Sequence, residues 1–323
     1  MLLRATDVVK NFHLRSKRAG AKVVVQAVAG VSLEVRRGET LGIVGESGCG
    51  KSTLARCLVQ LMPVTSGRVE FNGVEITGLS RRRLRPHRRE MQLVFQDPYA
   101  SLNPRRRAGD IVAEPLKISR FGDGEATRSR VDELFRIVGL DPASVNRYPH
   151  EFSGGQRQRI GIARALALSP SLVVADEPVS ALDVSVQAQV LNLMADLQRE
   201  LGLTYVFIAH DLGVVRHVSD RVGVMYLGEL VELGDVETLY ERPLHPYTEA
   251  LLSVVPELDD GTARPRERIV LTGDVPNPSM KPSGCPFHPR CPVATDRCST
   301  EKPVLVELAP GRSVACHYPR NAG

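Results

Sequence analysis

A short glycine-rich segment carries the residues best suited to chemistry in this chain. Residues 45–53 read Gly-Glu-Ser-Gly-Cys-Gly-Lys-Ser-Thr and fit the pattern G-x-x-x-x-G-K-[ST] completely. In this pattern the glycines let successive backbone N–H groups point at a β-phosphate, and the lysine brings a mobile positive charge to the β- and γ-phosphates. The serine hydroxyl that follows can bind Mg²⁺. The segment therefore predicts a site for a nucleotide.

The flanking sequence places this segment between a strand and a helix. Residues 39–44 are typical of a short buried strand, and residues 52–62 read as a helix that Pro63 ends. The N-terminus of such a helix adds its positive dipole end to the anion site. The predicted nucleotide-binding residues are Gly45, Glu46, Ser47, Gly48, Cys49, Gly50, Lys51, Ser52 and Thr53.

Two adjacent carboxylates follow another apolar run, at residues 172–175. Asp176 stands where a buried strand ends, so it can hold Mg²⁺ beside phosphates, directly or through water. Glu177 can act as general base or orient the attacking water. The alternative is a solvated Asp-Glu-Pro turn, but beside an intact phosphate loop the pair favours phosphoryl transfer to water.

The order of periodic segments predicts an α/β fold. A helical stretch over 184–200 separates two short apolar runs, as in a βαβ unit with a parallel sheet. Between residues 98 and 169 the pattern becomes helical, which indicates an insertion between two strand regions. The expected strands are 23–28, 31–35, 39–44, 91–96, 172–175 and 204–209, and the expected helices of the insertion are 112–118, 127–138 and 156–168.

Composition limits the class of protein. Hydrophobic residues make up 42% and charged residues 24%, as in ordinary globular proteins. No apolar run reaches the roughly 18 residues of a membrane span, and the first residues lack the apolar core of a signal peptide, so we expect a cytosolic protein. The net charge is +5, with arginines clustered at 81–89 and 105–107. A solvated basic face is favoured over a membrane surface, and without interleaved aromatic residues nucleic acid is not expected.

Read in chain order, these motifs resemble the ATPase subunits of ABC transporters, over residues 1 to about 255. Besides the phosphate loop and Asp176-Glu177, the resemblance rests on Phe95-Gln96, the tetrapeptide at 153–156, the segment 180–183 and His210. It implies a P-loop NTPase with a parallel-sheet core, N-terminal antiparallel strands and a helical subdomain at about 98–169. It also implies that ATP is hydrolysed with Mg²⁺ held by Ser52, Gln96 and Asp176.

The resemblance further implies roles for residues that are ambiguous alone. His210 would contact the γ-phosphate and Glu177, although a histidine at a strand end is more often structural. Gln96 would link the nucleotide to the membrane partner, and Phe12 would lie under adenine, although a lone aromatic residue is more often core. The residues that would contact the ATP of an opposing subunit are Ser153, Gly154, Gly155, Gln156 and Asp183.

Three stretches, at 94–105, 147–152 and 282–292, look like the dipeptide/oligopeptide permease ATPases, and Cys49 with Tyr99-Ala100-Ser101 looks like the second of the two types that such systems pair. The expected partners are therefore a paralogous ATPase in a heterodimer, two permease subunits and an extracytoplasmic solute-binding protein, at the cytoplasmic face of the membrane. Relatives also import nickel or other small solutes, which stays open as an alternative cargo. A soluble ABC ATPase acting outside transport is disfavoured because the permease-like tail is present.

The tail, residues 256–323, holds 11 of the 22 prolines, so long helices and central strands are not expected there. Its four cysteines are Cys285, Cys291, Cys298 and Cys316. Disulfides are not expected in a reducing cytosol, and this irregular, proline-flanked spacing suits a [4Fe-4S] cluster better than zinc. Similar tails in the permease family also imply the cluster. Zinc, free thiols, or a metal site that includes His288 or His317 stay open.

Overall fold

The structure is a computed structural model that describes residues 1–15, 22–255 and 268–321. The chain forms two compact units. The helical unit comprises Met1–Leu2, Val35–Glu39 and Gly78–Ile208. The loop unit comprises Leu3–Glu34, Thr40–Thr77 and Ala209–Gly323. The predicted division of the chain at residue 256 stays a prediction, since Pro256 lies outside the described residues.

The helical unit is built on parallel strands, as the apolar runs predict. In register, Leu93 lies opposite Val174 on one side, and Val174 lies opposite Val206 on the other. All five residues of β7 and of β8 are buried, which explains why their sequences do not alternate. The three strands are β6 (Met91–Val94), β7 (Leu172–Asp176) and β8 (Thr204–Ile208).

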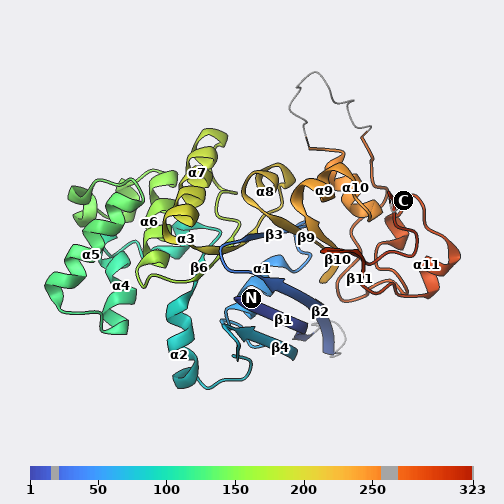
Figure 1. The fold of residues 1–323 in the computed structure, drawn as a ribbon, viewed down its shortest axis with the longest axis horizontal. Coiled ribbons are helices and arrows are strands. Elements are labelled where there is room, and N and C mark those ends of the chain that lie inside the picture. Colours follow the sequence, from blue (N-terminus) through green and yellow to red (C-terminus); the bar gives the residue numbers. More distant parts are fainter. Residues whose placement is uncertain (16–21, 256–267, 322–323) are drawn as a thin grey trace. The chain divides into compact units, whose positions relative to one another are not determined.

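Helices make up the rest of this unit, and α4, α5 and α6 pack against one another (Figure 1). The three helices expected in the insertion are present, and α4 runs on through Pro115. Asp123 begins α5 by accepting hydrogen bonds from the N–H groups of Glu125 and Ala126, as a good N-cap does. The helices are α2 (Arg81–Glu90), α3 (Pro98–Ser101), α4 (Ala108–Ser119), α5 (Gly124–Ile137), α6 (Gly154–Leu166) and α7 (Val184–Leu201), with 3-10 turns at Pro142–Asn146 and Pro149–Glu151.

The loop unit contains two sets of strands. In the first, the strand order is β2, β1, β4, β5, with β4 antiparallel to both β1 and β5. One expectation was wrong here: residues 23–28 and 31–35 belong to a single strand, because Gly30 takes a positive φ within it and does not end it. The strands are β1 (Leu3–Arg15), β2 (Lys22–Val35), β4 (Ser66–Phe71) and β5 (Val74–Glu75).

In the second set, β3 pairs in parallel with β9, while β10, β12 and β11 follow in antiparallel order. The tail adds β11 and β12 to this set, and its prolines stay outside both strands. The strands are β3 (Thr40–Val44), β9 (Arg221–Tyr226), β10 (Glu229–Asp235), β11 (Val306–Ala309) and β12 (Arg312–Val314). The helices are α1 (Lys51–Leu58), α8 (Leu212–Val218), α9 (Val236–Glu241), α10 (Pro246–Leu252) and α11 (Asp296–Thr300), with a 3-10 turn at His288–Arg290. Within the described ranges, no helix has the length and hydropathy to cross a membrane.

Candidate functional site

The glycine-rich segment forms a tight turn between the buried strand β3 and helix α1. Two glycines are required there for space as well as conformation. A Cβ on Gly45 would lie 2.2 Å from the carbonyl oxygen of Met225, and one on Gly50 would lie 2.0 Å from that of Ala27. Both also take positive φ, at 151° and 106°. Close contacts with the backbone of β9 and of β2 therefore restrict the conformation of the loop.

Lys51 begins α1 and lies inside the loop that precedes it. Its side chain is buried, and its Nζ donates to the carbonyl oxygens of Gly45, at 2.7 Å, and Glu46, at 3.1 Å. The ammonium is thus already positioned among the backbone groups that the motif reserves for phosphate. Cys49 is buried beside it, and this burial raises the pKa of the thiol, so Cys49 acts as a small apolar residue.

In the helical unit the structure brings Gln96 and Glu177 together. The Nε2 of Gln96 donates to Oε2 of Glu177 at 2.8 Å. Glu177 takes a φ of 47°, unusual for a residue with a side chain, and its N–H donates to the carbonyl oxygen of Ile208 at 3.0 Å. Asp176, which ends β7, is fully buried. A buried carboxylate, an amide and a half-buried carboxylate therefore lie at or just beyond the ends of two adjacent parallel strands.

The tetrapeptide at 153–156 begins α6 with a capping box. Ser153 Oγ accepts from the N–H of Gln156 at 3.3 Å, and Gln156 Oε1 accepts from the N–H of Ser153 at 2.9 Å. A Cβ on Gly155 would lie 2.4 Å from Val186 Cγ1, so this glycine lets α6 approach α7. Gly154 lies against Leu182, which precedes α7, and a Cβ there would lie 3.3 Å from Leu182 Cδ2.

Asp183 begins α7, next to this contact. Its Oδ1 accepts from Val186 N at 3.0 Å and from Ser185 Oγ at 2.8 Å, and the backbone hydrogen bond from Val186 lowers the pKa of the exposed Asp183 carboxyl. Ser153 and Asp183, far apart in the sequence, thus begin two helices whose first turns touch. Both side chains are exposed and available to another molecule.

Two predicted residues lie on the loop unit. His210 is exposed and precedes α8. Asp211 caps this helix, because its Oδ1 accepts a hydrogen bond from the N–H of Gly213 at 2.7 Å. Phe12 lies on β1, half-buried, with the Lys10 ammonium 5.4 Å from its ring centroid. The phosphate loop, His210 and Phe12 belong to this unit, whereas Gln96, Asp176 and Glu177 belong to the helical unit. The roles assigned to these residues stay predictions.

The four tail cysteines line one small, largely enclosed cavity with His245, Phe287, His288 and His317. All four are free thiols, and burial raises the pKa of Cys285 to about 11. In the part of the chain that the structure describes, no three His, Cys, Asp or Glu side chains are arranged to hold a single metal ion. The structure therefore gathers the four thiols but gives no evidence of a metal centre.

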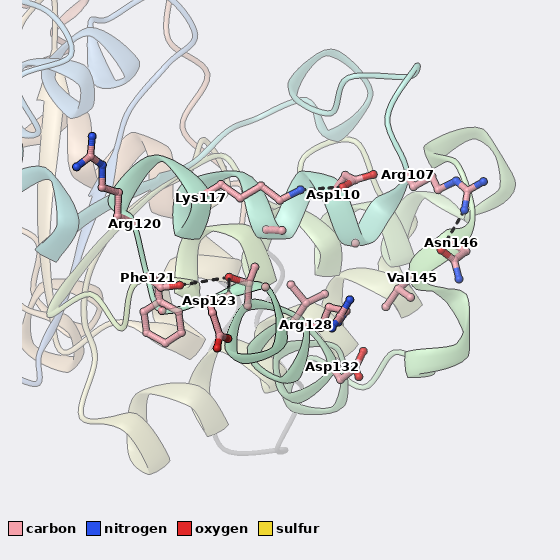
Figure 2. Close-up of a pocket in the computed structure, with 16 residues that line it drawn as sticks. Arg107, Asp110, Lys117, Arg120, Phe121, Asp123, Arg128, Asp132, Val145 and Asn146 are labelled. Carbon is pink, nitrogen blue, oxygen red and sulfur yellow. Dashed lines mark hydrogen bonds and ion pairs between the residues drawn. The ribbon is translucent and has the colours of Figure 1, made fainter.

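A separate cavity of about 820 Å³ lies in the helical unit, among α4, α5 and the 3-10 turn at Pro142–Asn146. Figure 2 shows its rim, where Lys117 Nζ lies 3.0 Å from Asp110 Oδ1 and Arg107 Nη1 donates to Asn146 Oδ1 at 3.1 Å. Val131 and Val145 contribute apolar surface to its wall. None of its lining residues belongs to the motifs found in the sequence, so it is not part of the predicted nucleotide site.

Comparison with known proteins decides the family. Residues 28–180 match the family described as ABC transporter, and residues 231–298 match the oligopeptide/dipeptide transporter C-terminal region. The oligopeptide transport ATP-binding protein AppF of Bacillus subtilis (strain 168) is 55% identical over 318 residues, covering 98% of this chain and 97% of that protein. The chain belongs to the ABC transporter ATPases. Another relative of this ABC ATPase, the di/tripeptide transport ATP-binding protein DppF of Pseudomonas aeruginosa (strain UCBPP-PA14), is 52% identical over 98% of the chain and 97% of its own length.

Solved structures agree with this assignment. The ABC ATPase resembles the dimeric, post-hydrolysis ATP-binding cassette MJ0796 bound to ADP and Pi, with a TM-score of 0.65 and 31% identity over 73% of this chain and 99% of that one. It also resembles cbiO1 from Clostridium perfringens, with a TM-score of 0.64 and 27% identity over 74% of this chain and 90% of that one. The fold class expected from the sequence is confirmed.

Sequence reasoning missed two contacts of this ABC ATPase. Arg157 lies over the ring of Tyr99, at 4.1 Å from its centroid, next to the tetrapeptide at 153–156. Arg290, in the tail, forms an ion pair with Glu46 of the phosphate loop, with 2.8 Å between Nη1 and Oε2. An arginine followed by a cysteine and a proline carries no local signal of a partner 244 positions away.

Proposed function

We propose that this ABC ATPase is the energy-coupling subunit of an importer for dipeptides or oligopeptides. The observation that carries the proposal is the match of residues 231–298 to the oligopeptide/dipeptide transporter C-terminal region, in a chain otherwise 55% identical to a named oligopeptide transport ATP-binding protein. A soluble ABC ATPase acting outside transport would have no need of such a region. ATP binding would close two ATPase subunits, and hydrolysis with product release would reopen them.

In this proposal each motif has one task in hydrolysis. The N–H groups of residues 45–50 and the Lys51 ammonium bind the β- and γ-phosphates. Glu177 accepts the proton of the attacking water or orients it, and His210 contacts the γ-phosphate. The hydrogen bond from Gln96 supports this role, because it fixes the Glu177 carboxylate in one orientation. Phe12 would stack under adenine.

The side chains available for Mg²⁺ suit that ion. Ser52, Gln96 and Asp176 offer hydroxyl, amide and carboxylate oxygens, the ligand atoms that this hard cation prefers. The place of Asp176 at the C-terminal end of the parallel strand β7 supports its assignment, since ligands of open α/β sheets bind beyond the carboxyl ends of the strands. When bound, Mg²⁺ would offset negative charge on the phosphates.

The proposed complex contains a second ATPase. Ser153, Gly154, Gly155 and Gln156 lie at the start of α6, next to Asp183 on α7, and would contact ATP held by the opposing subunit, with the positive end of the helix dipole toward its phosphates. We infer a heterodimer with a paralogous ATPase, docked at the cytoplasmic face of the membrane on two permease subunits that work with an extracytoplasmic solute-binding protein. The exposure of both helix starts supports a role at a subunit interface.

We also propose that Cys285, Cys291, Cys298 and Cys316 bind one [4Fe-4S] cluster. In such a cluster each thiolate binds a different iron, so the sulfurs need not converge on one point as the ligands of a single zinc ion must. The support is that four free thiols line the same small cavity. Bound there, the cluster would cross-link a proline-rich segment through four bonds.

The importer proposal is tested by co-purifying the chain with its membrane subunits and reconstituting the complex in vesicles. ATP hydrolysis should rise when a peptide-loaded binding protein is added, and Lys51→Ala should weaken that rise. A complex stimulated by nickel but not by peptides would transfer the proposal to metal import. Hydrolysis by the isolated chain as fast as that of the stimulated complex would overturn it.

The cluster proposal is tested on protein purified without oxygen. It should be brown and contain iron and acid-labile sulfide in similar amounts, and Cys298→Ser should lower both, whereas Cys57→Ser on α1 should leave both unchanged. Zinc without iron in such a preparation would refute the cluster.

A further inference from the structure

The tail reaches the phosphate loop through a two-armed ion pair. Arg290 Nη1 donates to Oε2 of Glu46 at 2.8 Å, and Nη2 donates to Oε1 at 3.0 Å. This parallel arrangement matches the planar guanidinium to the planar carboxylate and is stronger and more directional than a single-point contact. Glu46 is the first variable residue of the motif, directly after Gly45.

The ion pair is shielded from solvent. The side chain of Arg290 is 8% exposed and that of Glu46 25%. The hydrogen bonds to Glu46 raise the pKa of Arg290 further above its usual value, so the guanidinium is always charged. A partly buried pair is screened less by salt than a surface pair, and loss of one partner leaves an uncompensated charge.

The backbone of Glu46 is held as well as its side chain. Its N–H donates to Tyr247 Oη at 2.9 Å, and its carbonyl oxygen accepts from Lys51 Nζ. Tyr247 packs against Tyr226 and Phe287, with ring centroids 4.7 Å and 5.3 Å away. Phe287 and Arg290 belong to the same segment of the tail, so that segment supplies both the apolar wall and the cation.

Charge gives this contact a consequence for nucleotide binding. Glu46 places a carboxylate on the loop that would receive a triphosphate, and like charges repel unless a nearby cation offsets one of them. The Arg290 guanidinium offsets that charge and keeps the carboxylate turned toward the tail. Without it, both the shape of the loop and its potential would change.

We propose that Arg290 is a positioning residue of the nucleotide site: acting through Glu46, it keeps the phosphate loop in its binding shape and neutralises the carboxylate there. This rests on the proposed ATP site but assigns Arg290 no contact with nucleotide. The C-terminal segment is then a working part of the nucleotide site.

The test compares MgATP affinity in full-length variants purified without oxygen. Arg290→Met should raise the Kd about tenfold, in line with loss of one partner of a partly buried pair. Adding Glu46→Gln to Arg290→Met should recover much of that loss, because the unpaired carboxylate is gone. Arg297→Met is the matched control, since Arg297 lies in the same tail but pairs with the exposed Glu301.

Thermal melting separates folding from this effect: each variant should melt well above the temperature of the Kd measurement, so that the change in Kd and its recovery by Glu46→Gln are measured on folded protein. If Arg290→Met does not fold, Arg290→Lys takes its place: it keeps the charge but loses the fork, and should raise the Kd by about threefold. Equal Kd values for the Arg290 variants and Arg297→Met would overturn the proposal. Lys51→Ala distinguishes failure of the proposed ATP site from failure of the proposed role of Arg290. If Lys51→Ala abolishes MgATP binding while the Arg290 variants bind normally, the ATP site stands and only the role of Arg290 is refuted.

Discussion

One hydrogen bond, from Gln96, orients the carboxylate of Glu177. Gln96 holds the carboxylate from one side, while the backbone of Glu177 takes a strained, positive φ that directs the residue away from the buried strand before it. Such strain costs about 1–3 kcal/mol and persists only where surrounding structure enforces it. Here the bond from Glu177 N–H to Ile208 on the neighbouring strand does so. Backbone and side chain of Glu177 are therefore both held in place, as its proposed catalytic role requires.

Glu177→Gln should abolish turnover and leave ATP binding intact. The amide keeps the size and the hydrogen bond with Gln96 but cannot accept a proton, so we expect kcat to fall at least about 100-fold. Phosphate release and nucleotide affinity in the assembled complex measure the two effects. Glu200→Gln, on the exposed side of α7, is the control, and near-normal hydrolysis by Glu177→Gln would remove this residue from the mechanism.

At the scale of elements, side chains that cap helix N-termini both begin the helices and place candidate functional residues. Helices α5, α6, α7, α8 and α10 each begin at a side chain that accepts a backbone N–H, and two of these starts carry residues proposed to face a partner. His245, which begins α10, is fully buried, and its Nδ1 accepts from Tyr247 N at 3.1 Å. Only the unprotonated nitrogen can do this. Burial accordingly lowers the pKa of His245 to about 3.

This lowered pKa predicts a loss of stability in mild acid. The unfolded state takes up a proton near pH 6.5, whereas the folded state resists it until about pH 3, so stability is complete above pH 6.5 and falls below it. Between pH 6.5 and about pH 5.5 this one group should remove about 1 kcal/mol. His245→Asn keeps an acceptor at the helix start, and denaturant melts should show a shallower acid dependence for it; identical slopes would contradict the assignment.

The elements that sequence predicted best are those whose signal is local. Strands β3, β7 and β8 are buried along their whole length, so each appears in the sequence as a nearly unbroken apolar run. Helices α4, α5 and α6 follow the helical spacing of their apolar residues. The single strand β2 was missed because Gly30 looks like a break in the sequence, whereas the strand continues through it. The tail strands β11 and β12 were missed because prolines dominate the tail, although none falls within them. Contacts such as Arg290 with Glu46 leave no trace in local sequence.

At the scale of the whole molecule, the proposed machinery is divided between two subunits. In this proposal Lys51 and Glu177 would serve the nucleotide bound to this chain, whereas Ser153 would serve one bound to another. Because the chain looks like one half of a paired system, the two sites of the complex would differ.

Ser153→Arg should therefore impair hydrolysis at the partner's phosphate loop, while Lys51→Ala impairs the site built on its own. Single-turnover assays, with one site inactivated at a time, measure each effect. Asp123→Arg controls for the lost helix cap, since Asp123 begins α5 in the same unit without belonging to any motif. If both variants silenced the same site, the two-subunit arrangement would be refuted.

The contact between Arg290 and Glu46 also joins a segment that is synthesised early to one that is synthesised late. During synthesis the phosphate loop leaves the ribosome early, but its arginine partner follows 244 positions later, about 12 to 50 s at ordinary translation rates. Strand β9, which shapes Gly45, arrives late as well. Until then the carboxylate of Glu46 has no cation to offset its charge, and the loop lacks the packing of β9 against Gly45. If Arg290 positions the loop as proposed, a nascent chain released before this point would lack a complete nucleotide site, and full binding competence would be gained only after Arg290 has been synthesised.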